Sequence, residues 1–192
     1  RYTKRPFDED KPAPTGEMYQ LNTGLVDWAY ELTKDIQLPN NASARKHRML
    51  YTDHPMARKP PFVLKGDHIA ALTFWHGERM NDWANQWVRY WTDGQGEFVS
   101  SAMEDTGTYL SLSWLDRIGR VDKQRMLVLR TASNYTVPPP GVSAAENLQA
   151  ENEGYSGLGL ALESAYIVAS KVADTLMAGW HDYAENLPGQ ER

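Results

Sequence analysis

The chain has 192 residues, of which 41% are hydrophobic and 23% are charged, and its formal net charge is −5. This length and composition predict one folded globular domain and argue against a disordered chain. The absence of cysteine excludes disulfides and thiolate chemistry, and the lack of a basic block argues against nucleic acid as the main partner.

Two other kinds of site are not expected. The five histidines show no HExxH or other metal-ligand spacing, so we expect no metal site. No stretch approaches the roughly 18 uninterrupted apolar residues that a membrane-spanning helix needs. The best candidate, residues 158–177, is broken by Glu163, Lys171 and Asp174, so we expect no membrane span.

The first half of the chain predicts helices and strands joined by one long connection. Residues 1–16 are charged and contain proline, which favours an N-terminal loop, and residues 17–34 have the apolar spacing of a helix. Residues 39–61 form a polar, proline-rich connection. Strand-like pieces follow within residues 62–74, and residues 78–91 again have helical spacing.

The second half continues this alternation. Residues 97–102 predict a strand and residues 104–118 a helix. Residues 125–133 carry four consecutive apolar side chains, which is typical of a strand covered on both faces. One long helix is expected over residues 158–183. Its apolar stripe comprises Leu158, Leu162, Ala165, Ala169, Val172, Leu176 and Tyr183.

Strands that alternate with helices predict an α/β fold with a largely parallel sheet. In such sheets ligands bind at the carboxyl ends of the strands. Three expected strand ends carry aromatic or polar side chains, at residues 74–76, 103–105 and 133–134. We therefore expect these three segments to converge on one site.

The aromatic pair Phe74 and Trp75 has two interpretations. At a strand end an aromatic ring can stack on a flat heterocycle, which contributes about 1–3 kcal/mol for a nucleobase. The alternative is that both rings fill the core between sheet and helix. A similar choice holds for Trp83, Trp87 and Trp91, which form either a carbohydrate or subunit platform or ordinary helix packing.

The acidic pair Glu104 and Asp105 also has two interpretations. A carboxylate can accept hydrogen bonds from two sugar hydroxyls at once. Acidic side chains are also favoured at the start of a helix, where they meet the positive end of its dipole. We assign Asp105 to the helix start and leave both roles open for Glu104.

Two further motifs carry chemistry. Asn134 both donates and accepts hydrogen bonds, so its amide can read one edge of a purine. The glycines of GYSGLG (154–159) precede a helix but do not follow a strand directly, which makes this a weak phosphate-loop pattern. GxSxG is absent, and no Ser-His-Asp set is visible as a motif.

Four stretches together resemble the purine nucleoside permease family: GDHIAALTFWHG, FVSSAMEDTG, VLRTASNYTVPPPG, and AAENL followed by YSGLGLALESA. The resemblance runs from about Gly16 to Pro188 and implies a branch of the nucleoside phosphorylase superfamily. The implied fold is a three-layer α/β/α sandwich, of which this chain resembles the C-terminal half of a single domain.

The resemblance implies a role for each candidate site residue. Phe74, with Trp75 beside it, matches the aromatic residue that stacks on the base. Met103 and Glu104 match the Met-Glu pair that grips the ribose. Ser133 and Asn134 match the Ser-Asp pair that contacts the purine, so Asn134 and Glu104 are the residues implied in any cleavage.

Two departures from the superfamily pattern matter. Asn134 stands where an Asp protonates the leaving base; an amide is no general acid, but it can hydrogen-bond to N7 and a 6-oxo group. The Gly-rich loop and arginines that hold phosphate belong to the N-terminal half, which this chain does not match. We therefore expect an N-terminal chain or half-domain to complete the fold, because an incomplete sheet exposes an edge.

The expected function is purine nucleoside binding linked to nucleoside uptake, with N-glycosidic cleavage by phosphate or water in the complete protein. The alternative is a non-catalytic nucleoside-binding or storage protein on the same fold. Whether the chain is an enzyme stays open. The resemblance implies no cofactor (phosphate as a co-substrate if cleavage occurs), a purine nucleoside or nucleobase ligand, a homo-oligomer, and a periplasmic or extracellular location.

Overall fold

The structure is a computed structural model that describes residues 16, 18–153 and 157–190. The predicted N-terminal loop at residues 1–16 therefore lies outside the described residues, apart from Gly16, as does the start of GYSGLG. The elements in chain order are α1 (Thr23–Thr33), α2 (Ala42–Arg48), the 3-10 turn η1 (Pro55–Arg58), β1 (Asp67–Ala70), α3 (Glu78–Trp91), β2 (Phe98–Ala102), α4 (Asp105–Arg117), the 3-10 turn η2 (Lys123–Arg125), α5 (Ala144–Glu153), α6 (Leu158–Ala178) and α7 (Trp180–Tyr183).

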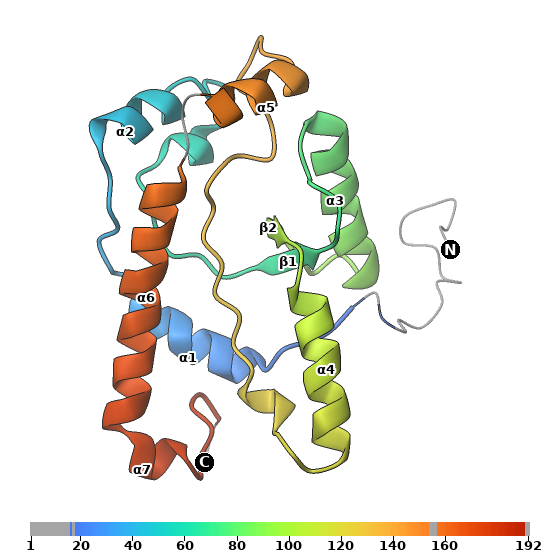
Figure 1. Ribbon diagram of the computed structural model, residues 1–192, viewed down its shortest axis with the longest axis vertical. Coiled ribbons are helices and arrows are strands. Elements are labelled where there is room, and N and C mark those ends of the chain that lie inside the picture. Colours follow the sequence, from blue (N-terminus) through green and yellow to red (C-terminus); the bar gives the residue numbers. More distant parts are fainter. Residues whose placement is uncertain (1–15, 17, 154–156, 191–192) are drawn as a thin grey trace.

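The two strands form a small parallel sheet at the middle of the molecule (Figure 1). Helix α3 connects β1 to β2, so this part of the chain is one β-α-β unit, as the alternating pattern predicts. The strands are in register from His68 opposite Ser100 to Ala70 opposite Ala102. The α/β class is thus confirmed in its coarse form, as helices around a small parallel sheet.

The best-packed core lies between this sheet and α3. Ile69, Trp75, Ala84 and Val88 are buried together, and Trp83, Trp87 and Phe98 pack against them. The apolar side chains of α3 recur at helical spacing, so one side of the helix faces the strands. The structure reproduces the expected bounds of α3 without change.

The expected buried strand over residues 125–133 is wrong. Its first residue belongs to η2, and the rest is irregular backbone that pairs with neither strand. The side chains of residues 126–128 are half-buried and Leu129 is 41% exposed. The segment runs between α6 and α4 (Figure 1) and neither strand pairs with it, so its apolar run lacks the neighbours that a central strand needs.

Other boundaries differ for local reasons. The polar connection at residues 39–61 contains α2 and η1, and α2 starts where the Asn41 side chain accepts from Ala44 N–H over 2.8 Å. The first strand-like piece, around Phe62 and Leu64, is exposed and unpaired with β1 or β2. Helix α1 begins only at Thr23, capped by the Asn22 side chain.

The C-terminal helix is divided, and its buried face is not the expected stripe. It breaks at Gly179 into α6 and the short α7. The buried residues of α6 are Ala161, Ser164 and Val168, whereas Leu158 and Leu162 are 53% and 61% exposed. Helix α6 packs against α1, and small side chains allow this close approach. Of the expected stripe, Val172 and Leu176 are half-buried, whereas Leu158 and Leu162 lie on the surface.

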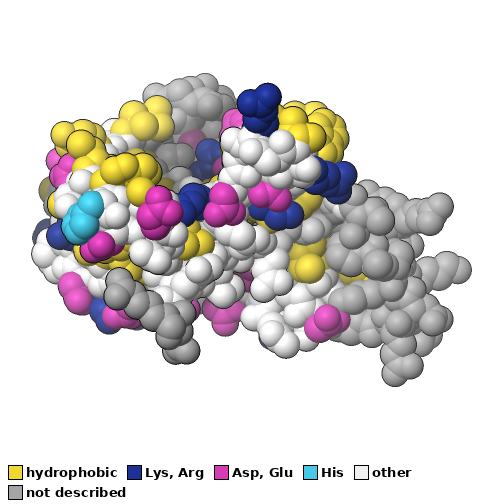
Figure 2. Space-filling view, turned by 90° about the horizontal axis from the view of Figure 1, so that it is seen from below, with side chains coloured by type: hydrophobic (Ala, Val, Ile, Leu, Met, Phe, Trp, Pro, Cys, Tyr) yellow, Lys and Arg dark blue, Asp and Glu magenta, His cyan; other side chains and the backbone are white. Residues whose placement is uncertain are grey.

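Several large apolar side chains lie on the surface. Seen from below, hydrophobic groups alternate with charged side chains across the described face (Figure 2). Among the exposed residues are Ile118 after α4, Met177 on α6 and Trp180 on α7.

Candidate functional site

The carboxyl ends of β1 and β2 lie side by side because the strands are parallel. Ala71 N–H donates to Ala102 C=O over 3.0 Å, which aligns the two segments that leave the sheet. The first leads to Phe74 and the second to Met103 and Glu104. Two of the three expected segments therefore meet at one edge of the sheet.

The third segment, residues 133–136, reaches the same place without being a strand. Gly77 N–H donates to Thr136 C=O over 2.7 Å, and Thr136 Oγ1 is 2.7 Å from Asn81 Oδ1. Tyr135 donates its hydroxyl to Ala57 C=O over 2.6 Å. Loop and side-chain hydrogen bonds thus bring Ser133 and Asn134 to the site where a central strand was expected to do so.

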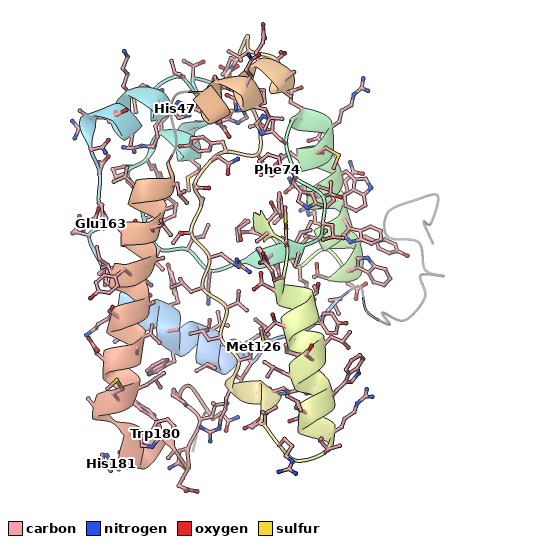
Figure 3. The ribbon with its side chains drawn as sticks, viewed as in Figure 1. His47, Phe74, Met126, Glu163, Trp180 and His181 are labelled. Carbon is pink, nitrogen blue, oxygen red and sulfur yellow. The ribbon has the colours of Figure 1, made fainter. Side chains whose placement is uncertain are left out.

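The aromatic pair is divided between surface and core. Phe74 is 54% exposed, and its ring centroid lies 6.2 Å from that of His76. Trp75 is buried and stacks on Trp83 at 5.1 Å with an interplanar angle of 9°. Burial of Trp75 fits the core-packing interpretation, so Phe74 is the ring of this pair that a ligand can reach (Figure 3).

Glu104 occupies the N-cap position of α4, and its side chain is 68% exposed. Its Oε2 accepts a hydrogen bond of 2.9 Å from Arg130 Nη2. Met103, next to it, is 44% exposed. Neither residue lines the open cavity that Asp105, the next residue, borders, so a ligand held by Glu104 would sit at the rim of this cavity.

Asp105 starts α4 as expected, and it also joins a network that the sequence did not reveal. Arg130 donates from Nε to Asp105 Oδ2 over 2.9 Å, and Nη2 lies 2.7 Å from the same oxygen. His68 Nε2 lies 2.7 Å from Oδ2, a close contact that is not aligned as a hydrogen bond. His68 Nδ1 is 2.9 Å from Ser100 Oγ.

The network shifts the affinity of its groups for protons. Burial lowers the pKa of His68, and the nearby Asp105 carboxylate opposes this effect. The hydrogen bond to Asp105, followed by that to Glu104, raises the pKa of Arg130. At neutral pH the network therefore holds a neutral imidazole, one guanidinium and two carboxylates.

Ser133 and Asn134 are half-buried, and the Ser133 hydroxyl lies 3.4 Å from Asn134 Oδ1. Both line an open cavity of about 2010 Å³. Its lining also includes Phe74, Asp105 and Arg130. This volume exceeds the 300–1,000 Å³ that is typical of a small-molecule site, so one small ligand would fill only part of it.

A second set of polar side chains, Asn147, His76 and Glu151, lies beside the segment that carries Phe74. The Asn147 amide lies 3.4 Å from His76 Nε2 and donates to Glu151 Oε1 over 2.8 Å. Tyr51 is fully buried against Tyr135 at 4.2 Å between ring centroids, and burial raises the pKa of its hydroxyl.

Within the described residues no cluster of three or more His, Cys, Asp or Glu could hold a metal ion.

Sequence reasoning missed Arg130 and His68. Arg130 stands directly before the polar stretch TASN, and an arginine at the end of an apolar run usually has an anionic partner. That signal could have linked it to the Glu-Asp pair. His68 gave no such signal, because only the pairing of β1 with β2 places it beside Ser100.

The fold and the site define an α/β protein whose polar and aromatic groups gather at the carboxyl edge of a parallel sheet, beside a large cavity. A family model described as "Purine nucleoside permease (NUP)" matches residues 1–188. The chain belongs to the purine nucleoside permease family, as its motifs predicted.

Individual relatives agree with this assignment. A purine nucleoside permease of Candida albicans (strain SC5314) is 29% identical over 171 residues, which is 88% of this chain and 41% of the relative. A probable purine nucleoside permease of Schizosaccharomyces pombe is 26% identical over 174 residues, or 91% of this chain and 49% of the relative. The chain thus spans less than half the length of these relatives. No solved structure matches it.

The family corrects the expected location. A periplasmic or extracellular protein was expected, but the relatives are named permeases, which denotes membrane transporters, and they come from yeasts. In the part of the chain that the structure describes, no helix combines the length and apolar character that crossing a bilayer requires.

Proposed function

We propose that this chain supplies purine-nucleoside-binding groups to a nucleoside uptake protein. The observation that carries the proposal is the convergence of three segments at one sheet edge: the exposed Phe74, the Glu104 carboxylate with its Arg130 partner, and Ser133 with Asn134. An aromatic face, an acceptor for hydroxyls and an amide are the three kinds of group that a purine nucleoside requires.

In this arrangement Phe74 stacks on the base, Met103 and Glu104 contact the ribose, and Ser133 and Asn134 contact the purine edge. The Asn134 amide can donate to N7 and a 6-oxo group, which favours inosine or guanosine over adenosine. Trp75 supports this site from the core through its stack on Trp83, and so it acts without touching the ligand.

The partners of this chain are part of the proposal, and two features of the described residues support them. A two-stranded sheet has two unpaired edges, and the cavity is wider than one ligand needs. We expect an N-terminal chain or half-domain to pack against the sheet and to complete a phosphorylase-type α/β/α sandwich. A homo-oligomer, expected from the resemblance, stays a prediction that light scattering of the full protein can test.

Cleavage of the nucleoside stays a separate prediction. Asn134 cannot deliver a proton as a carboxylic acid does, and binding alone requires no such step. No cofactor is part of the proposal, and phosphate enters only as a co-substrate if cleavage occurs. Base release from inosine, with and without phosphate, separates cleavage from binding; a storage protein would bind without supporting uptake.

The direct experiment measures inosine, guanosine and hypoxanthine binding to the full protein by isothermal titration calorimetry. We expect saturable inosine binding that Phe74→Ala and Glu104→Gln weaken. The exposed Trp114 and Glu163 lie outside the cavity lining and give matched control variants, Trp114→Ala and Glu163→Gln. Equal effects of the site and control variants would contradict the assignment.

A further inference from the structure

A chain of contacts runs from the sheet to the carboxylate proposed to hold the ribose. His68 on β1 faces Ser100 on β2, its partner in the strand register, with 2.9 Å between Nδ1 and Oγ. Nε2 of the same ring lies 2.7 Å from Asp105 Oδ2. Arg130 donates hydrogen bonds to both Asp105 and Glu104, so it connects the two carboxylates.

The partners determine where the protons lie. A carboxylate only accepts, so the approach of Nε2 to Asp105 favours the tautomer in which Nε2 carries the hydrogen. Nδ1 then accepts from the Ser100 hydroxyl. Both strands are anchored in the sheet, so the imidazole has a fixed position from which it supports Asp105.

Arg130 divides its donors between two carboxylates. Nε and Nη2 meet Asp105, while Nη2 also donates to Glu104. The side chain of Asp105 is 18% exposed and that of Glu104 is 68% exposed. The better buried carboxylate therefore fixes the guanidinium, and the guanidinium in turn fixes the exposed one.

The charge of this group depends on His68. With a neutral imidazole the network carries one positive and two negative charges, which leaves an excess of acceptor capacity for ribose hydroxyls. A protonated imidazole adds a second cation beside Asp105 and repels Arg130. Among the described residues, Asp105 and Arg130 are the charged groups that act on His68.

We propose that His68, acting through Asp105, is a positioning residue that aligns Arg130 and Glu104 for the ribose and makes nucleoside binding weaken at acidic pH. This inference rests on the proposed function. Protonated His68 pushes Arg130 toward Glu104, so that the carboxylate is neutralised by the arginine and accepts ribose hydroxyls less well. The base, which contacts Phe74 and Asn134, does not depend on this network.

The test measures inosine and hypoxanthine dissociation constants of the full protein between pH 5 and pH 8. Wild-type protein should lose up to about tenfold in inosine affinity on acidification, the factor that corresponds to one pKa unit of coupling, while hypoxanthine affinity stays constant. His68→Gln keeps a donor toward Asp105 and does not titrate, so it should retain the pH 8 inosine affinity at every pH. His68→Phe should bind inosine weakly throughout and hypoxanthine normally.

The outcomes separate the two proposals. If wild-type protein binds neither compound, both are overturned. If it binds inosine but His68→Gln keeps the wild-type pH profile, only the positioning role is overturned. The positioning role is also overturned if His68→Phe lowers the affinities for inosine and hypoxanthine equally, because that pattern indicates a general structural effect. Thermal unfolding of each variant identifies misfolded protein. If His68→Phe is misfolded, the pH profile of His68→Gln decides the test.

Discussion

Arg130 donates to the Glu104 carboxylate over 2.9 Å across 26 positions of sequence, and it shares the same guanidinium with Asp105. The pair links the irregular segment after η2 to the start of α4. Ser133 and Asn134, a few residues further on, are held separately by the hydrogen bonds of Tyr135 and Thr136. The pair thus fixes the part of the segment that lies before these bonds, next to the carboxylates of Glu104 and Asp105.

Replacement of Arg130 by Met should weaken both the fold and the site. Asp105 is largely buried, and loss of its cation leaves a poorly solvated carboxylate, which costs on the order of 1 kcal/mol after allowance for the partial exposure of Arg130. Chemical denaturation measures the stability change, and calorimetry the loss of inosine affinity. The exposed Arg89 on α3 provides the control, and an Arg89→Met variant with the same loss would contradict a specific role for Arg130.

Replacement of Phe74 by Ala should weaken binding of the base itself. Stacking of one nucleobase on an aromatic ring contributes about 1–3 kcal/mol, so inosine and hypoxanthine should lose affinity to the same extent. Phe74 is 54% exposed, and the fold should tolerate the change. A loss confined to inosine would assign Phe74 to the sugar, and no loss at all would remove it from the site.

The helices with strong apolar spacing, and the β-α-β unit, could be predicted from the sequence. The apolar spacing of a helix or strand is visible within that element alone, and the order of the elements then indicates the unit. The bounds of α3 are as expected, and β2 differs by one residue. The strand prediction for residues 125–133 was wrong because a strand requires a neighbouring strand to pair with, and a hydrophobic run alone does not supply one. Helix α5 was missed although Ser143 and Glu146 form a capping box, with 2.9 Å between Ser143 N and Glu146 Oε2.

The site was predicted in part for the same reason. Phe74 and Glu104 each follow a strand of the sheet, so their approach could be expected, whereas Asn134 follows a segment that is not a strand and is brought there by loop hydrogen bonds. The alternatives at Trp75 needed the structure, because only the packing of α3 on the sheet shows that this ring is covered. The His68–Asp105–Arg130 network combines three segments distant in sequence, and no local pattern connects them.

Trp75 offers a contrast with Phe74. It is 9% exposed and stacks on Trp83 within the best-packed core, so Trp75→Ala should destabilise the fold by about 3–5 kcal/mol. Urea denaturation monitored by fluorescence measures this loss. Trp75→Phe retains an aromatic ring and should recover much of the stability. A Trp75→Ala variant of normal stability with weakened nucleoside binding would instead place this ring in the ligand site.

Asn134 should determine which purine is preferred. An amide can donate to a 6-oxo group, whereas an ionised carboxylate only accepts and would repel that oxygen. Asn134→Asp should therefore weaken inosine by about tenfold, equivalent to roughly 1.4 kcal/mol, and affect adenosine less. Competition binding measures the ratio of the two affinities. Ser133→Ala keeps the amide and serves as the comparison; an unchanged ratio in Asn134→Asp would show that this residue does not contact position 6.

The stability of the fold should fall on mild acidification, and His68 should be one cause. Burial lowers the pKa of His68 in the folded state, while in the unfolded chain it is near 6.5. The unfolded state therefore binds more protons in the window between these two values, so the free energy of unfolding is highest above pH 6.5 and declines as the pH falls toward the folded-state pKa. Burial lowers the pKa of His47 as well, and it adds to the same decline. Denaturation midpoints between pH 5 and pH 8 measure the slope. His68→Gln should reduce that slope without removing it, because His47 still titrates; a slope identical to wild type would show that the imidazole of His68 is as free to take up a proton in the fold as in the unfolded chain.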